Sequence, residues 1–273
     1  MKLILRLALI AAIVATAFVT RADILYGMNS GILTRIDTDT LTATPIGDTG
    51  IFAVSGLEFG PDGQLYGLAP DTNELIKVDI NTGEAFVVGS TILNISRGSG
   101  MGWDPTTNQM YTVAKLGSTP DILVTVSLDT GSTTAITSIS GIANFKISGL
   151  DFTTSGELYG VRGGSPQQLL NIDKTNGNTT LIGTAALPPI GSLTISPISG
   201  IAWTVTPPGE LYSVDLENGV ATNHGLLTGI VNGPAGISAL ASIPSSSVIT
   251  TFCAGILLSV RRRRRSNLNG TRA

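Results

Sequence analysis

The chain has 273 residues, enough for one large domain or two ordinary ones. Only 13% of its residues are charged, against roughly 25% in an average globular protein. All 19 acidic residues lie between positions 23 and 260, with only seven of the 16 lysines and arginines. This acidic central part argues against nucleic acid as a partner, because phosphate binding needs clustered basic side chains. The single cysteine, Cys253, excludes an internal disulfide and a cysteine-based metal site.

The first 22 residues have the pattern of a secretory signal peptide. Lys2 and Arg6 supply positive charge, and an uninterrupted run of apolar or small side chains follows. Small residues at the −3 and −1 positions predict cleavage after Ala22, with cleavage after Ala17 as the second choice. An uncleaved N-terminal anchor is the alternative.

The stretch from Ser55 to Gly89 predicts four short strands. Turn sequences separate them, namely Pro61-Asp62-Gly63 and Asn81-Thr82-Gly83. We expect the strands at Ser55–Gly60, Leu65–Leu68, Leu75–Ile80 and Glu84–Val88.

Three sequence markers of this unit recur through residues 23–243. The first is Leu-Tyr-Gly, represented by Tyr26, Tyr66, Tyr111, Tyr159 and a degenerate copy at Ile201-Ala202-Trp203. The second is an apolar residue, often followed by Asp, before a turn, as at Ile36-Asp37, Val78-Asp79, Leu128-Asp129, Ile172-Asp173 and Val214-Asp215. The third is Ser-Gly-apolar, at Ser55-Gly56-Leu57, Ser99-Gly100-Met101 and Ser148-Gly149-Leu150, with weaker copies at Gly191-Ser192-Leu193 and Ala235-Gly236-Ile237.

Five copies with a period of about 44 residues and four strands each predict a single all-β domain, a five-bladed β-propeller. An isolated blade cannot bury both faces, so blades stacked in a ring make the core. The array is offset at its ends. Residue 23 begins at a Leu-Tyr-Gly strand, and the last repeat element, 236–242, is a Ser-Gly-type strand. We therefore expect the C-terminal strand to complete the first blade and close the ring, so that both termini emerge near that blade.

The repeats resemble the YVTN and NHL-like propellers of bacterial secreted proteins over residues 23–243. The residues that carry the resemblance are Ser55 to Gly63, Leu65-Tyr66-Gly67, Val78-Asp79 and Thr82-Gly83. The resemblance implies that the Ser-Gly strand lies near the axis, where small residues suit close backbone contacts. It implies little about activity, because propellers host many unrelated functions.

The C-terminal end combines a proline, three serines, an apolar stretch and five consecutive arginines. The uncharged residues 248–260, at about 1.5 Å each, are short for a bilayer core of about 30 Å. If the apolar segment is counted from Ile243, its length is only marginal for crossing the bilayer core. Arginines directly after an apolar segment are the expected stop-transfer arrangement, so we interpret 244–260 as a motif with a transmembrane helix and 261–273 as a cytoplasmic tail. A core helix would not precede five arginines, and a basic tail would not need the apolar run.

This end resembles the PEP-CTERM sorting signal of Gram-negative bacteria. The residues that carry the resemblance are Ile243, Pro244, Ser245, Ser246, Arg261, Arg262, Arg263, Arg264 and Arg265. The resemblance implies that a membrane exosortase cleaves near the proline motif and releases or transfers the protein to the exterior. The family's usual Val-Pro-Glu-Pro reads Ile-Pro-Ser-Ser here, so an unprocessed membrane anchor is the alternative.

Side chains for catalysis or metal binding are scarce. The only histidine, His224, cannot complete a metal site or a triad, and we interpret it as a solvated loop residue. The aspartates before the turns, together with Asp39, are oxygen donors suited to Ca²⁺, but they equally suit acceptance of turn N–H groups. We therefore assign no catalytic, cofactor-binding or metal-binding residue and no cofactor.

One pair of carboxylates is compatible with a glycan hydrolase or lyase. Glu58 and Asp151 follow Gly-Leu at equivalent places in two blades and are expected to face a channel. Trp103 and Trp203 occupy comparable places near blade ends, where they would stack on sugar rings or belong to the core.

We therefore predict an exported, non-enzymatic binding module at the cell surface or in the extracellular matrix. Its expected partners are an exosortase-like processing enzyme, the membrane through the C-terminal segment, and an extracellular polysaccharide or matrix protein. The alternatives are an enzyme acting on extracellular glycan and an unprocessed, membrane-anchored propeller.

Overall fold

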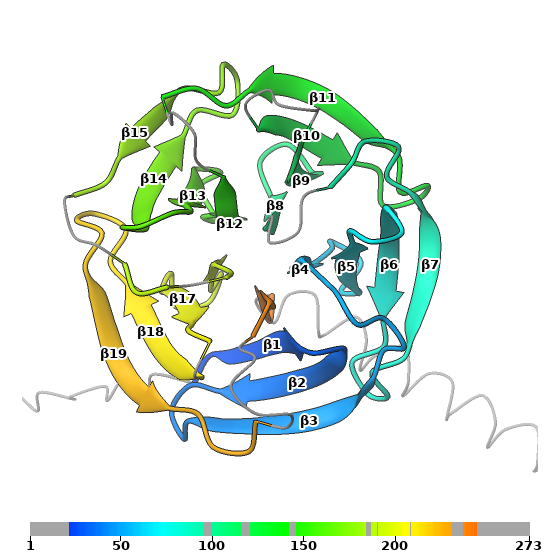
Figure 1. The fold of residues 1–273 in the computed structure, drawn as a ribbon, viewed down its shortest axis with the longest axis vertical. Coiled ribbons are helices and arrows are strands. Elements are labelled where there is room, and N and C mark those ends of the chain that lie inside the picture. The colour runs from blue at the N-terminus through cyan, green and yellow to red at the C-terminus, as the bar shows by residue number, and fades with distance from the viewer. Residues whose placement is uncertain are drawn as a thin grey trace, which may run out of the picture.

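The computed structural model describes residues 22–95, 100–115, 121–141, 146–183, 187–189, 191–207, 209–230 and 237–244. Every regular element in these ranges is a β-strand. The strands form five four-stranded antiparallel sheets, which are arranged as blades around a central axis (Figure 1). The predicted five-bladed β-propeller is confirmed.

Each blade runs from an innermost strand at the axis to an outermost strand at the rim. The innermost strands of blades 1 to 5 are β20 (Ala239–Ser242), β4 (Gly56–Phe59), β8 (Met101–Asp104), β12 (Ile147–Phe152) and β16 (Thr194–Ile195). The second strands are β1 (Ile24–Asn29), β5 (Leu65–Ala69), β9 (Gln109–Ala114), β13 (Leu158–Arg162) and β17 (Ala202–Val205). The third strands are β2 (Ile32–Asp37), β6 (Glu74–Val78), β10 (Ile122–Val126), β14 (Gln168–Ile172) and β18 (Glu210–Val214). The outermost strands are β3 (Thr42–Asp48), β7 (Ala85–Ser90), β11 (Thr133–Ser138), β15 (Thr179–Leu181) and β19 (Ala221–Leu226).

Blade 1 is built from both ends of the chain, as the offset of the repeats predicts. Strand β20 pairs antiparallel with β1, with Leu240 opposite Gly27. In blade 2 Leu57 is likewise opposite Gly67, so Leu240 occupies the apolar position of the Ser-Gly-apolar marker. The copy assigned from sequence to Ala235-Gly236-Ile237 was therefore three residues too early.

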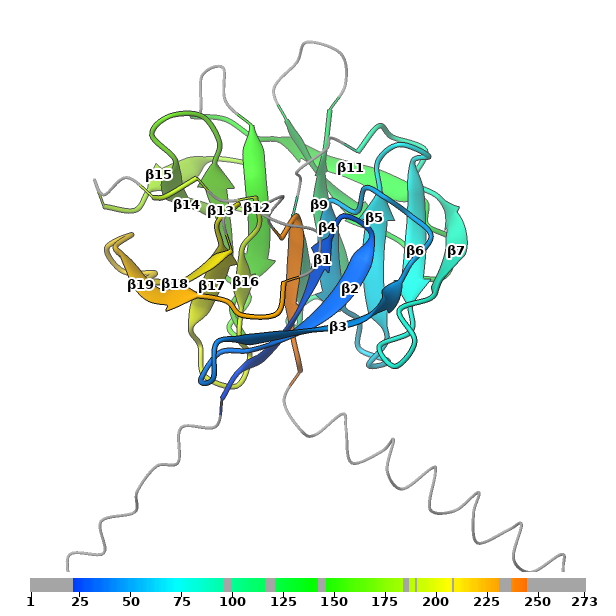
Figure 2. The same cartoon turned by 60° about the horizontal axis from the view of Figure 1, so that its bottom comes forward.

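Both ends of the described chain lie on one face of the ring. Strand β1 begins there and β20 ends there (Figure 2). The two ends remain hydrogen-bonded, because the Ile243 amide donates to the Ile24 carbonyl at 3.2 Å. We call this the exit face. Strands alternate in direction within a blade, so the described parts of the segments that connect one blade to the next lie toward the opposite face, called here the far face.

Aromatic residues of the second strands pack each blade against the next one. The ring of Tyr26 in blade 1 lies 5.7 Å from that of Phe59 in blade 2, and Tyr111 lies 5.1 Å from Phe152. Such pairs contribute roughly 0.5–1.5 kcal/mol beyond the area they bury. In blade 5 the equivalent residue is Trp203, which is opposite Ser213 in the register. The sequence alignment, which placed Ala202 there, was wrong by one residue.

Near the axis the backbones of neighbouring blades come close together, as predicted for the Ser-Gly positions. A Cβ atom added to Gly100 would lie 2.2 Å from the Leu150 amide nitrogen of the next blade. At the rim, hydrogen bonds also join neighbouring blades at or beside their outermost strands. The Ser140 amide donates to the Gly177 carbonyl at 2.9 Å, and the Ala43 amide donates to the Thr228 carbonyl at 2.7 Å.

Most of the predicted export signals lie outside the described residues. This applies to residues 1–21, Ser245, Ser246 and the arginine run at 261–265. Ala22, Ile243 and Pro244 are described, and all three are half-buried. Within the described ranges, no helix has the length and apolar character needed to cross a membrane.

Candidate functional site

The innermost strands present one layer of side chains at the same depth along the axis. Each of these residues lies opposite the aromatic residue of the next strand in its blade. From blade 1 to blade 5 the layer consists of Ala241, Glu58, Gly102, Asp151 and Thr194. Three members are small or neutral and two are acidic, so the two carboxyl groups are the distinctive feature of this layer.

The structure brings the predicted pair, Glu58 and Asp151, into direct contact. Their strands belong to blades 2 and 4, and blade 3 contributes Gly102 between them. The two side chains are hydrogen-bonded to each other. A Cβ atom added to Gly102 would lie 3.0 Å from Asp151 Oδ1, so the missing side chain keeps the space beside the pair open.

Both carboxyl groups are buried, with 8% of Glu58 and 4% of Asp151 exposed. Glu58 Oε1 accepts the Phe59 amide at 2.8 Å. Asp151 Oδ1 accepts the Phe152 amide at 2.7 Å, and its Oδ2 accepts the Ile195 amide at 2.6 Å. The Asp151 carboxylate therefore links blade 4 to blade 5 as well as to blade 2.

Burial shifts the pKa of both groups upward. Burial, and then the neighbouring Asp151 charge, raise the pKa of Glu58 well above its usual range. Burial raises the pKa of Asp151 to about 7, although the amides of Ile195 and Phe152, the Thr194 hydroxyl and Glu58 act in the opposite direction. At neutral pH the pair therefore retains at least one proton, because two adjacent buried carboxylates cannot both ionise readily.

This geometry does not suit glycoside hydrolysis. Hydrolases need carboxyl groups at least about 5 Å apart, with the sugar between them. Here the two groups are hydrogen-bonded directly and buried between blades. The arrangement joins strands of different blades, and it offers no space between the carboxyls for a glycosidic bond.

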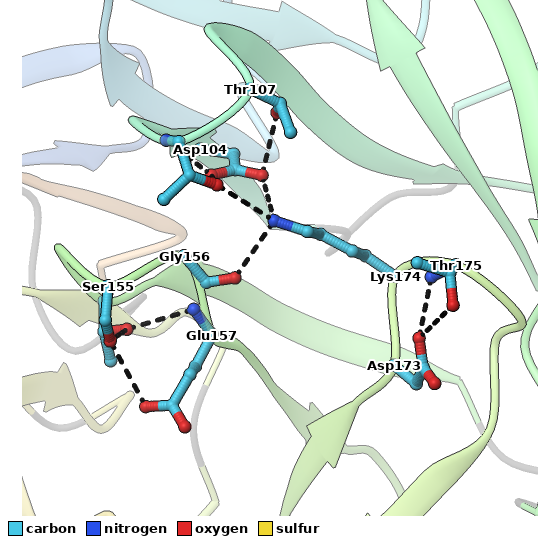
Figure 3. A network of polar contacts seen from close by, with 10 residues as sticks. Asp104, Thr107, Ser155, Gly156, Glu157, Asp173, Lys174 and Thr175 are labelled. Atoms are coloured by element: carbon cyan, nitrogen blue, oxygen red, sulfur yellow. Dashed lines mark hydrogen bonds and ion pairs between the residues drawn. The ribbon is translucent and has the colours of Figure 1, made fainter.

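A second buried carboxylate joins blades 3 and 4 near the exit face. Asp104, at the end of β8, has a fully buried side chain that forms an ion pair with Lys174 from the turn after β14 (Figure 3). Lys174 Nζ also donates to Thr106 Oγ1 and to the Gly156 carbonyl, both at 3.2 Å. Burial alone would raise the pKa of Asp104, but hydrogen bonds from Lys174, Thr106 and Thr107 lower it to about 2. Sequence reasoning missed this contact because 70 residues separate its partners.

A third buried carboxylate joins the two ends of the ring. Asp23, at the start of blade 1, accepts hydrogen bonds from three residues of blade 5. These are Ser196 Oγ at 2.6 Å, Ser199 Oγ at 2.5 Å and the Trp203 indole N–H at 2.8 Å. Sequence reasoning missed this contact too, and the only signal was an aspartate placed directly before the first strand.

The recurrent aspartates serve mainly as turn acceptors. The Asp79 Oδ1 atom accepts the Asn81 amide at 2.7 Å, and Asp37, Asp173 and Asp215 make equivalent bonds. The hydrogen bond from the turn amide lowers the pKa of Asp79. Asp129 is the exception, because β10 ends at Val126 and Ser127 takes the aspartate position in the turn. The described residues contain no group of three or more His, Cys, Asp or Glu side chains that could hold a metal ion.

The remaining aromatic and histidine candidates do not form a sugar-binding surface. Trp103 lies on the innermost strand β8 and Trp203 on the second strand β17, so the expectation of comparable places was wrong. Trp103 is half-buried, and Trp203 is 5% exposed. His224 lies on β19 and not in a loop as predicted. It is exposed, and its Nε2 is 2.8 Å from Ser213 Oγ.

No family model and no curated protein matches this chain. Solved structures match its fold. A chain from a nidogen–laminin complex is 12% identical, with a TM-score of 0.54, and the match covers 82% of this chain and 99% of that one. TolB from Acinetobacter baumannii is 16% identical with a TM-score of 0.47, covering 75% of this chain. A structural genomics protein of unknown function from Bacteroides thetaiotaomicron is 13% identical with a TM-score of 0.49, covering 66% of this chain. This chain spans 53% of the latter two proteins. At these identities the comparisons show the propeller fold alone.

Proposed function

We propose that this protein is an exported β-propeller of the cell surface or extracellular matrix that acts as a binding module without catalysis of its own. The N-terminal leader directs export, and the segment from Ile243 to Arg265 delivers the protein through the membrane as a PEP-CTERM-like sorting signal. The acidic, turn-rich composition supports this proposal.

The observation that carries the proposal is the position of the two chain ends. Both leave the ring on the exit face, at blade 1, where Ile243 is hydrogen-bonded to Ile24. An anchor or sorting segment that continues from Pro244 attaches to this face. The segments of the far face, which connect the blades, are then left free for a partner.

The exposed side chains of the far-face segments favour a protein partner. Phe52, between β3 and β4, is 78% exposed, and Ile92, between β7 and β8, is 71% exposed. Ile92 also has a φ of 61°, which is strained for a β-branched residue. Strain of this kind is more common at binding sites than elsewhere. The similar structure titled as a nidogen–laminin complex comes from a protein–protein assembly, although its likeness to this chain concerns the fold only.

The export part of the proposal is tested by locating the mature C-terminus. Intact mass and peptide mapping are applied to the native protein from membrane, matrix and medium fractions. A chain that ends near Pro244 and lies outside the cell supports the sorting signal. A chain that retains Arg261–Arg265 and occurs only in membranes would overturn it in favour of an unprocessed anchor.

The binding part is tested separately with full-length variants in the producing cells. We expect the double variant Phe52→Ser with Ile92→Ser to be exported to the medium normally. Its retention in the matrix should fall at least several-fold. Phe86→Ser, on the rim strand β7, removes a side chain of 53% exposure and serves as the matched control. Equal retention of both variants and wild type would refute a far-face binding surface.

A further inference from the structure

The hydrogen-bonded carboxyl groups at the axis have no role in the proposed binding function. Glu58 and Asp151 are buried, and they come from two blades that are not neighbours. We propose that they form a proton-binding site, in which one shared proton holds the inner strands of blades 2 and 4 together and its loss loosens the centre of the ring. This inference rests on the geometry of the axis and is independent of export and of the far face.

The pair joins three of the five innermost strands by hydrogen bonds and lies against a fourth. Glu58 lies on β4 and Asp151 on β12, and Gly102 of β8 lies between them. Asp151 continues the connection to β16 through the Ile195 amide at 2.6 Å and the Thr194 hydroxyl at 3.3 Å. A change of charge in the pair therefore acts on several blades at once.

The described neighbours of the pair offer no positive charge to replace the proton. The cross-strand neighbours in this layer are tyrosines: Tyr66 opposite Glu58, Tyr111 opposite Gly102 and Tyr159 opposite Asp151. Strands β16 and β20 contribute Thr194 and Ala241, which do not titrate in water. Asp104, at the end of β8, is neutralised by its own partner, Lys174. Among the residues that the structure describes, no lysine or arginine is a main electrostatic influence on either carboxyl.

The direction of the pH effect follows from the raised pKa values. Between about pH 4 and the folded-state pKa values, the native protein binds more protons at this pair than the unfolded chain does. Stability from the pair is therefore fully present below about pH 4 and is lost as the pH rises through about 7. When both groups are ionised, two negative charges lie in contact in a buried layer, and their repulsion separates blades 2 and 4.

Glu58→Gln is the sharpest variant, because a glutamine reproduces the protonated form of Glu58. Its amide oxygen accepts the Phe59 amide, and its NH₂ group donates to Asp151 at every pH. We expect the Tm of the purified full-length wild type to fall by about 5–10 °C between pH 5 and pH 8 through this pair. The fall is expected to be smaller in Glu58→Gln, because only Asp151 still titrates there. Glu84→Gln, the same substitution at an exposed turn position, is the matched control and should keep the wild-type pH dependence.

Equal pH dependence of Tm in Glu58→Gln, Glu84→Gln and wild type would overturn the proposal. Infrared spectra of the wild type give a second, direct measurement that does not depend on any variant folding. A protonated carboxyl band at pH 7 is expected, and its absence would also overturn the proposal. The Tm series is repeated with EDTA and with Ca²⁺, and a cation that abolishes the fall in wild type would show that the pair binds a metal ion instead of a proton.

Discussion

Replacement of Lys174 by methionine tests how blades 3 and 4 are held together. The Lys174 side chain is 22% exposed, whereas that of its partner Asp104 is completely buried. Methionine keeps a flexible apolar side chain beside the Phe152 ring, over which the ammonium lies at 5.5 Å, but removes the charge. The variant therefore leaves a buried, ionised carboxylate with hydroxyl and amide donors only.

The expected loss of unfolding free energy at pH 7 is about 2–4 kcal/mol. Breaking a fully buried ion pair typically costs about 3–5 kcal/mol, and the partial exposure of Lys174 reduces this somewhat. For a domain of this size the loss corresponds to a fall in Tm of about 5–15 °C. Asp104 has a lowered pKa of about 2, so its contribution is present above about pH 4 and lost as the pH falls toward 2. The difference between variant and wild type should therefore shrink in acid.

Thermal denaturation of the purified full-length protein is the assay, and Lys77→Met is the matched control. Lys77 also lies over an aromatic ring, that of Tyr66, and pairs with Asp62 at 3.8 Å. Both members of this second pair are well exposed, at 40% and 43%, so its loss should cost no more than about 1 kcal/mol. Asp104→Asn in the Lys174→Met background should restore part of the stability by removing the buried charge. If Lys174→Met costs no more than Lys77→Met, the reasoning about buried charge is refuted.

Five further variants test the turns, the closure and the axis by urea denaturation. Asp79→Ala should lower the free energy of unfolding by about 0.5–1.5 kcal/mol because it removes the turn hydrogen bond, while Asp129→Ala should change it by no more than about 0.5 kcal/mol. Equal effects would contradict the assignment of Ser127, and not Asp129, to the aspartate position of its turn. Asp23→Ala removes three hydrogen bonds to blade 5 and should cost at least about 2 kcal/mol; a neutral result would show that the closure does not depend on it. Gly100→Ala should destabilise strongly because its Cβ would meet the next backbone at 2.2 Å, whereas Gly191→Ala, with its nearest atom at 3.7 Å, should be tolerated; similar costs would rule out axial crowding as the reason for the glycine.

The fold could be predicted because each sequence marker reflects a packing or turn requirement that every blade must meet. A tyrosine recurs because each second strand must pack against the next blade, and a small residue recurs because the innermost backbones nearly touch. Strand limits followed from the turn residues. The predicted strand at Leu65–Leu68 is observed at Leu65–Ala69, and the one at Leu75–Ile80 at Glu74–Val78. These constraints act between residues that are close in sequence, so the spacing of the marker residues indicates them directly.

The candidate site was only partly predictable. Its contacts depend on the strand register and on the lack of a side chain at the equivalent position of blade 3. Equivalent positions indicated that Glu58 and Asp151 share a layer. Their direct contact also requires that blade 3 places Gly102 between them, which no pattern in either strand reveals. Asp129 shows the same limit: it resembles the other turn aspartates in sequence, but β10 ends early enough for Ser127 to take their place.

The least regular repeat, blade 5, departs from the pattern where it meets blade 1. Blade 1 is assembled from both chain ends, and hydrogen bonds join β20 to β1 where the other blades have a turn. Separated chain ends have more conformational entropy to lose, so this interface needs additional contacts. Trp203 in place of tyrosine supplies an indole N–H to Asp23, and Ser196 adds a second donor. The Ser242 hydroxyl of β20 in turn donates to the Ile195 carbonyl at 3.2 Å. The residues that depart from the repeat pattern are thus the residues that close the ring. Similarity between repeats is therefore least informative at this interface.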